Sequence, residues 1–173
     1  MSEALRREAA SPLSREDQAL AAQWEEAALA RADSYLSQVR RLDQRIDQKL
    51  RFRAQLRDLS LRITGDPCAR PGSGADDSRM AARDRMMDLD QEIDREVDHL
   101  VNLKNEIWAV LDRIENPEVA LILDDLYLNG CTARAAAERS GYSLRYLYKL
   151  RRWGLMEVDR ILREEAPMRA YVR

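Results

Sequence analysis

The sequence predicts an all-α fold, in which a long antiparallel coiled-coil helical hairpin is followed by a C-terminal helix-turn-helix domain. Three observations support this prediction. The 173 residues contain only 6 glycines and 5 prolines, and aromatic residues make up only 6% of the chain, a composition typical of long helices. An apolar residue recurs at every seventh position in the middle of the chain. Short helical segments separated by glycine follow near its end.

The chain is expected to begin with a flexible segment, residues 1–13, and to enter the hairpin region, residues 14–115, through a first helix. Ser14 is a candidate N-cap for that helix, with Asp17 three positions later. The sequence leaves open whether this helix is separate or runs on into the hairpin.

Opposite charges favour pairing of the two long helices. Residues 36–63 carry eight cations and three acids, whereas residues 76–115 carry twelve acids and six cations. Residues 64–77 lie between them and contain two prolines and three glycines, which predicts a loop. The second helix has a seven-residue apolar period, interrupted only at Glu96, and the first has a looser stripe. The period comprises Met86, Leu89, Ile93, Leu100, Leu103, Ile107, Val110 and Ile114; the stripe comprises Leu36, Val39, Leu42, Ile46, Leu50, Leu56, Leu59 and Ile63.

Residues 116–165 are predicted to form the helix-turn-helix domain, and residues 166–173 a tail. A first helix is expected to start at Pro117 and to bury Val119, Ile122, Leu123 and Leu126. Glycines are expected to end this helix and the short one after it, in the left-handed conformation. The predicted N-caps are Asn116, Thr132 and Ser143, and the two terminating glycines are Gly130 and Gly141.

The last helix has two contrasting faces. Its predicted buried stripe comprises Leu147, Leu150, Gly154, Val158 and Ile161. The opposite face and its flanks carry long donors and planar side chains, and residues 139–152 contain no acid. Such a face suits base edges and phosphates in the major groove of DNA. The predicted DNA-binding residues are Ser143, Arg145, Tyr146, Tyr148, Lys149, Arg151 and Arg152. The alternative reading is an ordinary amphipathic helix with a solvated basic face.

Nothing in the pattern points to an enzyme, and we expect no catalytic residues, no metal site and no cofactor. His99 is the single histidine, and Cys68 and Cys131 are not at metal-ligand spacing. The chain lacks an apolar run long enough for a membrane span, and its first residues lack an apolar signal core. These features predict a cytoplasmic protein without membrane contact.

The segment LYLNGCTARAAAERSGYSLRYLYKLRRWGLMEVDRIL resembles the fourth conserved region of bacterial RNA polymerase sigma factors, a helix-turn-helix that reads the −35 promoter element. The segments YLSQVRRLDQRIDQKL, SGADDSRM and DLDQEIDREVDHLVNLKNEIWAVLDRIENPE resemble small phage and prophage proteins with such a tail, relatives of ArpU-type phage regulators of late transcription. The resemblance spans residues 35–162 through many short matches. It implies a phage-type transcription regulator in which Arg145, Tyr146, Tyr148, Lys149 and Arg152 face DNA.

Three hypotheses follow for the function. The first is a DNA-binding transcriptional regulator of phage or prophage type, whose hairpin dimerises or contacts RNA polymerase. Its partners would be double-stranded DNA, RNA polymerase as a further candidate, and a second copy of the chain. The second is a protein–protein adaptor with a vestigial sigma-like tail, and the third is a small terminase-like DNA-packaging subunit. The sequence identifies neither the DNA target nor the direction of regulation.

Overall fold

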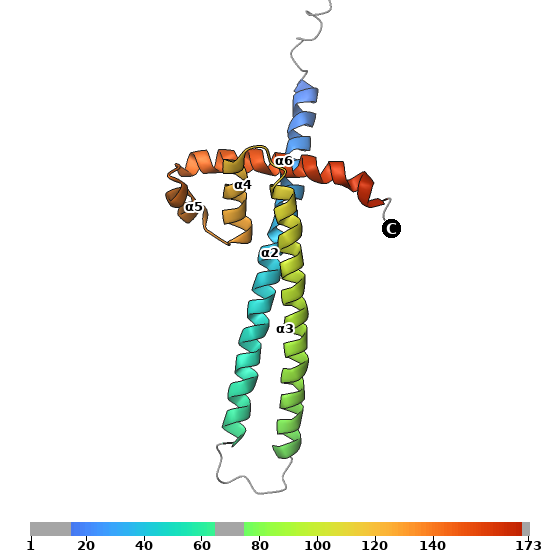
Figure 1. Cartoon of the computed structure of the whole chain (residues 1–173), viewed down its shortest axis with the longest axis vertical. Helices are drawn as coiled ribbons and strands as arrows, with labels where there is room; N and C mark the ends of the chain where they lie inside the picture. The colour runs from blue at the N-terminus through green and yellow to red at the C-terminus, as the bar shows by residue number, and fades with distance from the viewer. Residues whose placement is uncertain (1–14, 65–74, 171–173) are drawn as a thin grey trace, which may run out of the picture.

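The structure, a computed structural model, describes residues 15–64 and 75–170 of the chain. Five α-helices and one π-helical segment make up these two ranges, which contain no strand (Figure 1). The all-α prediction is therefore confirmed for the described residues. In chain order the elements are α2 (Arg15–Thr64), α3 (Ala75–Leu111), α4 (Pro117–Leu123), η1 (Asp124–Leu128), α5 (Ala133–Ser140) and α6 (Leu144–Ala170).

The two long helices, α2 and α3, pack side by side and run in opposite directions (Figure 1). The predicted attraction between their opposite charges is realised in ion pairs whose residue numbers rise along α2 as they fall along α3. These pairs are Arg45–Glu96 at 3.0 Å, Lys49–Glu92 at 2.7 Å, Lys49–Glu96 at 3.1 Å and Arg53–Asp90 at 2.6 Å. Helix α2 is continuous from Arg15, which answers the question that the sequence left open.

The predicted loop at residues 64–77 is shorter than expected, because α2 continues to Thr64 and α3 already begins at Ala75. Residues 65–74, which hold the prolines and glycines that predicted the loop, lie outside the described residues. So do residues 1–14, including Ser14, the predicted N-cap of α2, and the predicted flexible segment.

The seam between α2 and α3 follows the seven-residue period on α3, whereas the predicted stripe on α2 is buried only as far as Ile46. Leu56 is half-buried, and the side chain of Ile63 lies outside what the structure describes. On α3 the side chains of Leu89, Ile93, Leu103, Ile107, Val110 and Ile114 are buried, and on α2 those of Leu36, Val39, Leu42 and Ile46. Further along α2, Leu50 is 42% exposed and Leu59 is 54% exposed, so neither is buried in the seam as the predicted stripe implies. Lys49 and Arg53 reach from this part of α2 to the acids of α3 instead.

Helix α4 begins as predicted, with Asn116 as its N-cap and Pro117 in the first helical turn. The side-chain oxygen of Asn116 accepts hydrogen bonds from the backbone N–H groups of Glu118 (2.9 Å) and Val119 (3.4 Å). The continuation differs from the prediction, because η1 is π-helical and its wider turn rotates the buried face. As a result Tyr127 and Leu128 are buried, while Leu126 is only half-buried.

Helices α5 and α6 have the predicted boundaries at the turn that joins them. Thr132 caps α5 and Ser143 caps α6 through hydrogen bonds from Ala135 N–H and Tyr146 N–H, each 3.2 Å long. Gly130 and Gly141 have φ angles of 64° and 70°, in the left-handed region that favours glycine. Helix α6 then extends to Ala170, beyond the predicted end of the domain at residue 165.

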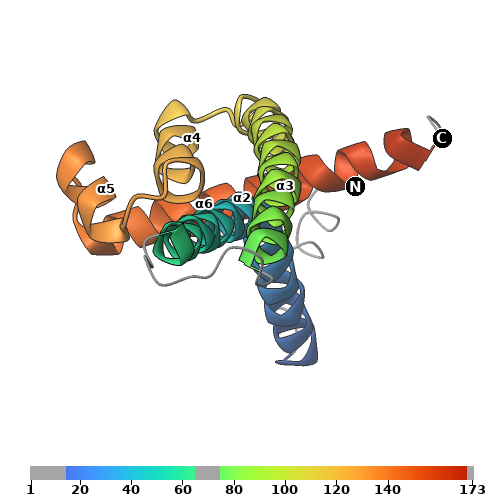
Figure 2. The same ribbon diagram turned by 90° about the horizontal axis from the view of Figure 1, so that it is seen from below.

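Helix α6 lies across the two long helices, with α4 and α5 to one side of them (Figures 1 and 2). Its predicted stripe is buried, and it contacts α2 where the two helices cross. A single cluster of buried side chains draws on all six elements. Ion pairs from Arg31 to Asp159 (2.8 Å) and from Arg113 to Glu165 (2.6 Å) fasten the second half of α6 to the hairpin.

Gly154 lies where α6 packs tightly against side chains of α4. A Cβ atom at this position would lie 2.6 Å from Val119 Cγ1 and 2.8 Å from Leu123 Cδ1. Glycine normally weakens a helix interior by about 1 kcal/mol relative to alanine. Here the absent side chain lets the two helix backbones come together.

Among the described helices, none is both long and apolar enough to cross a membrane.

Candidate nucleic-acid interface

The first half of α6 is held by its buried side and exposed on the other. Leu147 is fully buried and Leu150 is 5% exposed, whereas the neighbouring residues Arg145, Tyr148 and Lys149 are exposed. Helical periodicity therefore separates an apolar back from a polar front, as the sequence predicted. The turn at Gly141 and the capping oxygen of Ser143 place this exposed front directly after α5.

Arg145 and Lys149 are four residues apart, so they lie next to each other on one face of α6. Within residues 15–64 and 75–170, neither forms an ion pair or a side-chain hydrogen bond. Tyr148 lies beside Lys149, and its side chain is 53% exposed. These three side chains are free to contact a ligand without breaking an internal interaction.

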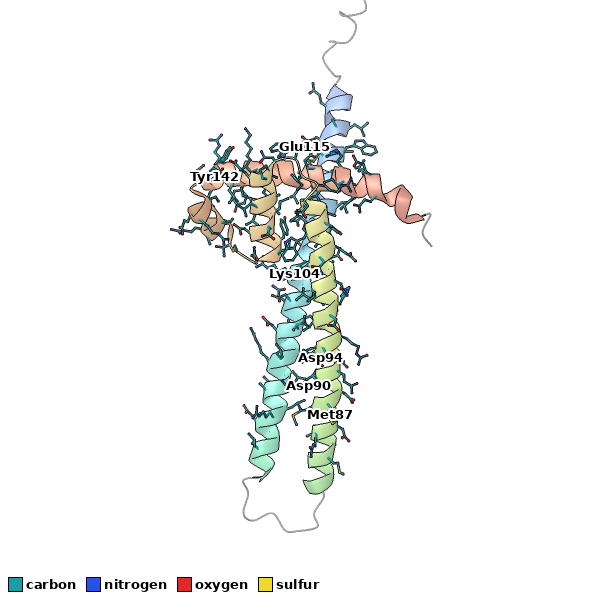
Figure 3. The ribbon with its side chains drawn as sticks, viewed as in Figure 1. Met87, Asp90, Asp94, Lys104, Glu115 and Tyr142 are labelled. Carbon is teal, nitrogen blue, oxygen red and sulfur yellow. The ribbon has the colours of Figure 1, made fainter. Side chains whose placement is uncertain are left out.

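Tyr146 belongs to a small aromatic cluster at the start of α6. Its ring meets that of Tyr142 edge to face, with 5.0 Å between the ring centroids. Tyr142 lies at the turn between α5 and α6 (Figure 3), and a hydrogen bond to Glu118 raises the pKa of its hydroxyl. Tyr146 is still 42% exposed, so its outer edge remains available beside Arg145.

Arg151 is engaged within the protein. Its guanidinium lies 2.5 Å from Asp33 Oδ1 and donates a 2.6 Å hydrogen bond to the hydroxyl of Tyr127. The Tyr127 hydroxyl in turn donates to Asp33, and burial, together with this hydrogen bond, raises the pKa of Tyr127. Arg151 therefore fastens α6 to α2 and η1, and its charge is already compensated by Asp33.

Arg152 is also paired, although its side chain is exposed. Its guanidinium lies 2.7 Å from Glu25 Oε1, on the segment of α2 that extends beyond α6 (Figure 1). An exposed ion pair of this kind contributes little to stability. Arg152 can therefore exchange Glu25 for a phosphate at small cost, which Arg151 cannot do.

Asp124 and Asp125, the two acids of η1, both have partners within the protein. Asp125 is 7% exposed and lies 2.8 Å from a guanidinium nitrogen of Arg139. Asp124 accepts hydrogen bonds from Trp108 Nε1 and Asn129 Nδ2, each 2.9 Å long. Three of the five cations in residues 139–152 thus have acidic partners, and Arg145 and Lys149 remain.

Among the described residues, no group of three or more His, Cys, Asp or Glu side chains is arranged to hold a metal ion. His99 is exposed on α3, and Cys131 is a free thiol whose sulfur accepts a 3.0 Å hydrogen bond from Arg139. Cys68 lies outside the described residues.

Comparisons with protein-family models, with curated proteins and with solved structures gave no match. The resemblance to sigma factors and phage regulators therefore remains a prediction from the residues themselves.

Proposed function

We propose that the protein is a DNA-binding transcriptional regulator of phage or prophage type, and that α5, the turn at Gly141 and α6 act as a helix-turn-helix. The observation that carries this proposal is a pair of cations, Arg145 and Lys149, beside the exposed ring of Tyr148 on the front of α6. Neither cation has a partner among the residues that the structure describes. Arginine and lysine pair with guanine in the major groove, and tyrosine contacts phosphates or thymine methyl groups.

The proposal also accounts for the rigid attachment of α6. A recognition helix must be held by its back while its first turns enter the groove. The ion pairs of Arg151 and Arg31 with the hairpin provide such a hold. The antiparallel pair of α2 and α3, which we interpret as a coiled coil, would then dimerise or contact RNA polymerase, because one small helix-turn-helix rarely gives sufficient affinity alone.

The test is fluorescence anisotropy of labelled duplexes, from the DNA around the gene and from unrelated sequence, over a series of salt concentrations. We expect a sequence-specific, salt-sensitive signal. Changing both Arg145 and Lys149 to alanine should weaken specific binding by about 1 to 3 kcal/mol per lost base contact. The matched control is Arg85→Ala with Lys104→Ala, which removes the same two charges from α3.

Equal loss in the two double variants would show that general charge, rather than the front of α6, attracts the DNA. If the variant with alanine at Arg145 and Lys149 bound DNA as tightly as the parent, the proposed recognition face on α6 would be wrong. Circular dichroism should show unchanged helical content in all variants, because the four side chains have no described ion pairs.

The adaptor hypothesis is favoured by a different feature, the segment of α2 that extends beyond α6 (Figure 1). Leu20 is 53% exposed and Trp24 is 59% exposed on this segment, and residues four apart lie on one helical face. Exposed aromatic side chains of this kind are enriched at protein interfaces. An adaptor predicts weak DNA binding that is equal on all sequences, so the same titration separates the two functions.

A further inference from the structure

A cavity beside the exposed front of α6 lies where α2, the start of α5 and the first half of α6 meet. Its volume is about 480 Å³, and it is open to solvent. Helix α2 lines it with Ser37 and Arg40, α5 with Thr132 and Ala133, and α6 with Tyr148 and Arg151. Tyr148 belongs both to this cavity and to the exposed front of α6, so the two surfaces are continuous.

The charge of this cavity is positive because of Arg40. Asp33 also lines the cavity, but Arg151 lies 2.5 Å from it and compensates its charge. Arg40 is exposed, and it forms no ion pair or side-chain hydrogen bond with any residue that the structure describes. The cavity thus offers one free guanidinium together with the hydroxyls of Ser37 and Tyr148, which are suitable donors for a phosphate.

We infer that this cavity binds a phosphate group, and that the phosphate belongs to the backbone of the duplex held by α6. The inference rests on the proposed function. A helix inserted in the major groove is flanked by the two sugar–phosphate strands, and phosphate contacts beside the groove set the position of the protein. Arg40 would make such a contact, so the hairpin itself takes part in DNA binding.

The chain offers a matched control for Arg40 at the next position. Arg41 carries the same charge and is exposed, but it donates a 2.7 Å hydrogen bond to the carbonyl oxygen of Ser34 and lines a different cavity with His99 and Leu103. Replacing Arg41 changes the net charge as much as replacing Arg40 does, without touching the proposed phosphate site.

The experiment compares the full-length parent, Arg40→Ala and Arg41→Ala by anisotropy on a specific and an unrelated duplex over a salt series. We expect Arg40→Ala to weaken binding to both duplexes by a similar factor of about 10, and the slope of log K against log salt to fall by about 0.9, the value for one lost phosphate contact. Arg41→Ala should stay close to the parent. Arg40→Lys should recover part of the affinity, because it restores the charge without the planar fork.

A second arm measures inorganic phosphate binding by isothermal titration calorimetry at constant ionic strength. One possible result is that Arg40→Ala lowers the affinity for inorganic phosphate but leaves DNA binding unchanged. In that case the cavity binds a free anion, and the proposed role of Arg40 in DNA binding is wrong. If Arg40→Ala and Arg41→Ala lost the same amount of affinity for DNA, the proposed phosphate site would be wrong. If the parent fails to bind DNA of any sequence, the proposed function itself is wrong, which is distinguishable from both results.

Discussion

Gly154 shows how one missing side chain sets the distance between two helices. Its position on α6 faces Val119 and Leu123 of α4, both buried, at distances that leave no room for a methyl group. We expect Gly154→Ala to gain about 1 kcal/mol of helix propensity and to lose about 1 to 3 kcal/mol through overpacking. The free energy of unfolding, measured by urea denaturation, should therefore fall.

The control for this prediction is the double variant Gly154→Ala with Val119→Ala. The added methyl group would occupy the space that the valine vacates, so the two losses should not add. A Gly154→Ala variant as stable as the parent, or more stable, would show that the side chains of α4 move to accommodate the methyl group at little cost in free energy.

Tyr127 gives a prediction about alkaline pH. Burial raises the pKa of its hydroxyl, and so does the hydrogen bond to Asp33. Because the pKa is higher in the folded state than in the unfolded state, the stabilisation is complete below about pH 10 and is lost as the pH rises above it. The free energy of unfolding should thus fall more steeply above about pH 10 in the parent than in Tyr127→Phe. Parallel curves would contradict the assignment.

Single-residue features were predictable from the sequence wherever the cause is local. The capping roles of Asn116, Thr132 and Ser143 follow from the short distance between a side-chain oxygen and the next backbone N–H groups. The pairing of Arg151 with Asp33 and of Arg152 with Glu25 joins residues 118 and 127 positions apart. No sequence pattern records those contacts, so the basic stretch looked freer of acids than it is.

At the scale of elements, Glu96 is the one polar residue in the seven-residue apolar period of α3. Its carboxylate lies 3.0 Å from Arg45 and 3.1 Å from Lys49, and its second oxygen, Oε2, is buried with no described hydrogen-bond partner. Figure 3 shows the neighbouring part of α3, where Asp90 and Asp94 are labelled.

We expect Glu96→Leu to raise the free energy of unfolding by about 1 kcal/mol, because it removes the cost of burying Oε2 without a described hydrogen-bond partner. The substitution leaves no buried cation unpaired, since Arg45 is exposed and Lys49 keeps its ion pair with Glu92. Glu92→Leu is the control. Glu92 is exposed, so its replacement should change stability by less than about 0.5 kcal/mol. Thermal denaturation of both variants checks this, and a loss of stability in Glu96→Leu would mean that the ion pairs outweigh the cost of burial.

At the level of elements, helix type and helix pairing were predictable because periodicity and charge are properties of the chain itself. The π-helical turn of η1 and the exposure of Leu50 and Leu59 were not. The first depends on how α4 packs against α6, and the second on where the seam between α2 and α3 closes. The DNA-binding face of α6 stays a prediction, in which Arg145 and Lys149 are exposed as the periodicity indicates. The cavity beside Arg40 could not be predicted, because it depends on the fold bringing α2 next to the start of α5.

The whole molecule combines the hairpin and the C-terminal helices in one core, because buried side chains of all six elements are contiguous. We therefore expect one cooperative unfolding transition in differential scanning calorimetry, with equal calorimetric and van't Hoff enthalpies. Two separated transitions would show that residues 116–165 fold independently of the hairpin, as a sequence-based division into domains suggests.

This shared core bears on the proposed function, because it fixes the proposed recognition face of α6 relative to the hairpin. Asp159 is 5% exposed and forms ion pairs with Arg31 of α2 and with Arg163 of α6, with an N···O distance of 2.8 Å in each. If the hairpin joins two copies or contacts RNA polymerase, as proposed, this rigid link would determine where the recognition helix meets the DNA.

The measurement that tests the central claim most directly is selection of bound duplexes from a random-sequence library by the purified parent, alongside the variant with alanine at Arg145 and Lys149. The proposed function predicts that the parent enriches one short sequence motif and that the variant loses or relaxes it at the positions read by the two side chains. Recovery of the same unenriched pool with both proteins would contradict sequence-specific DNA binding through α6.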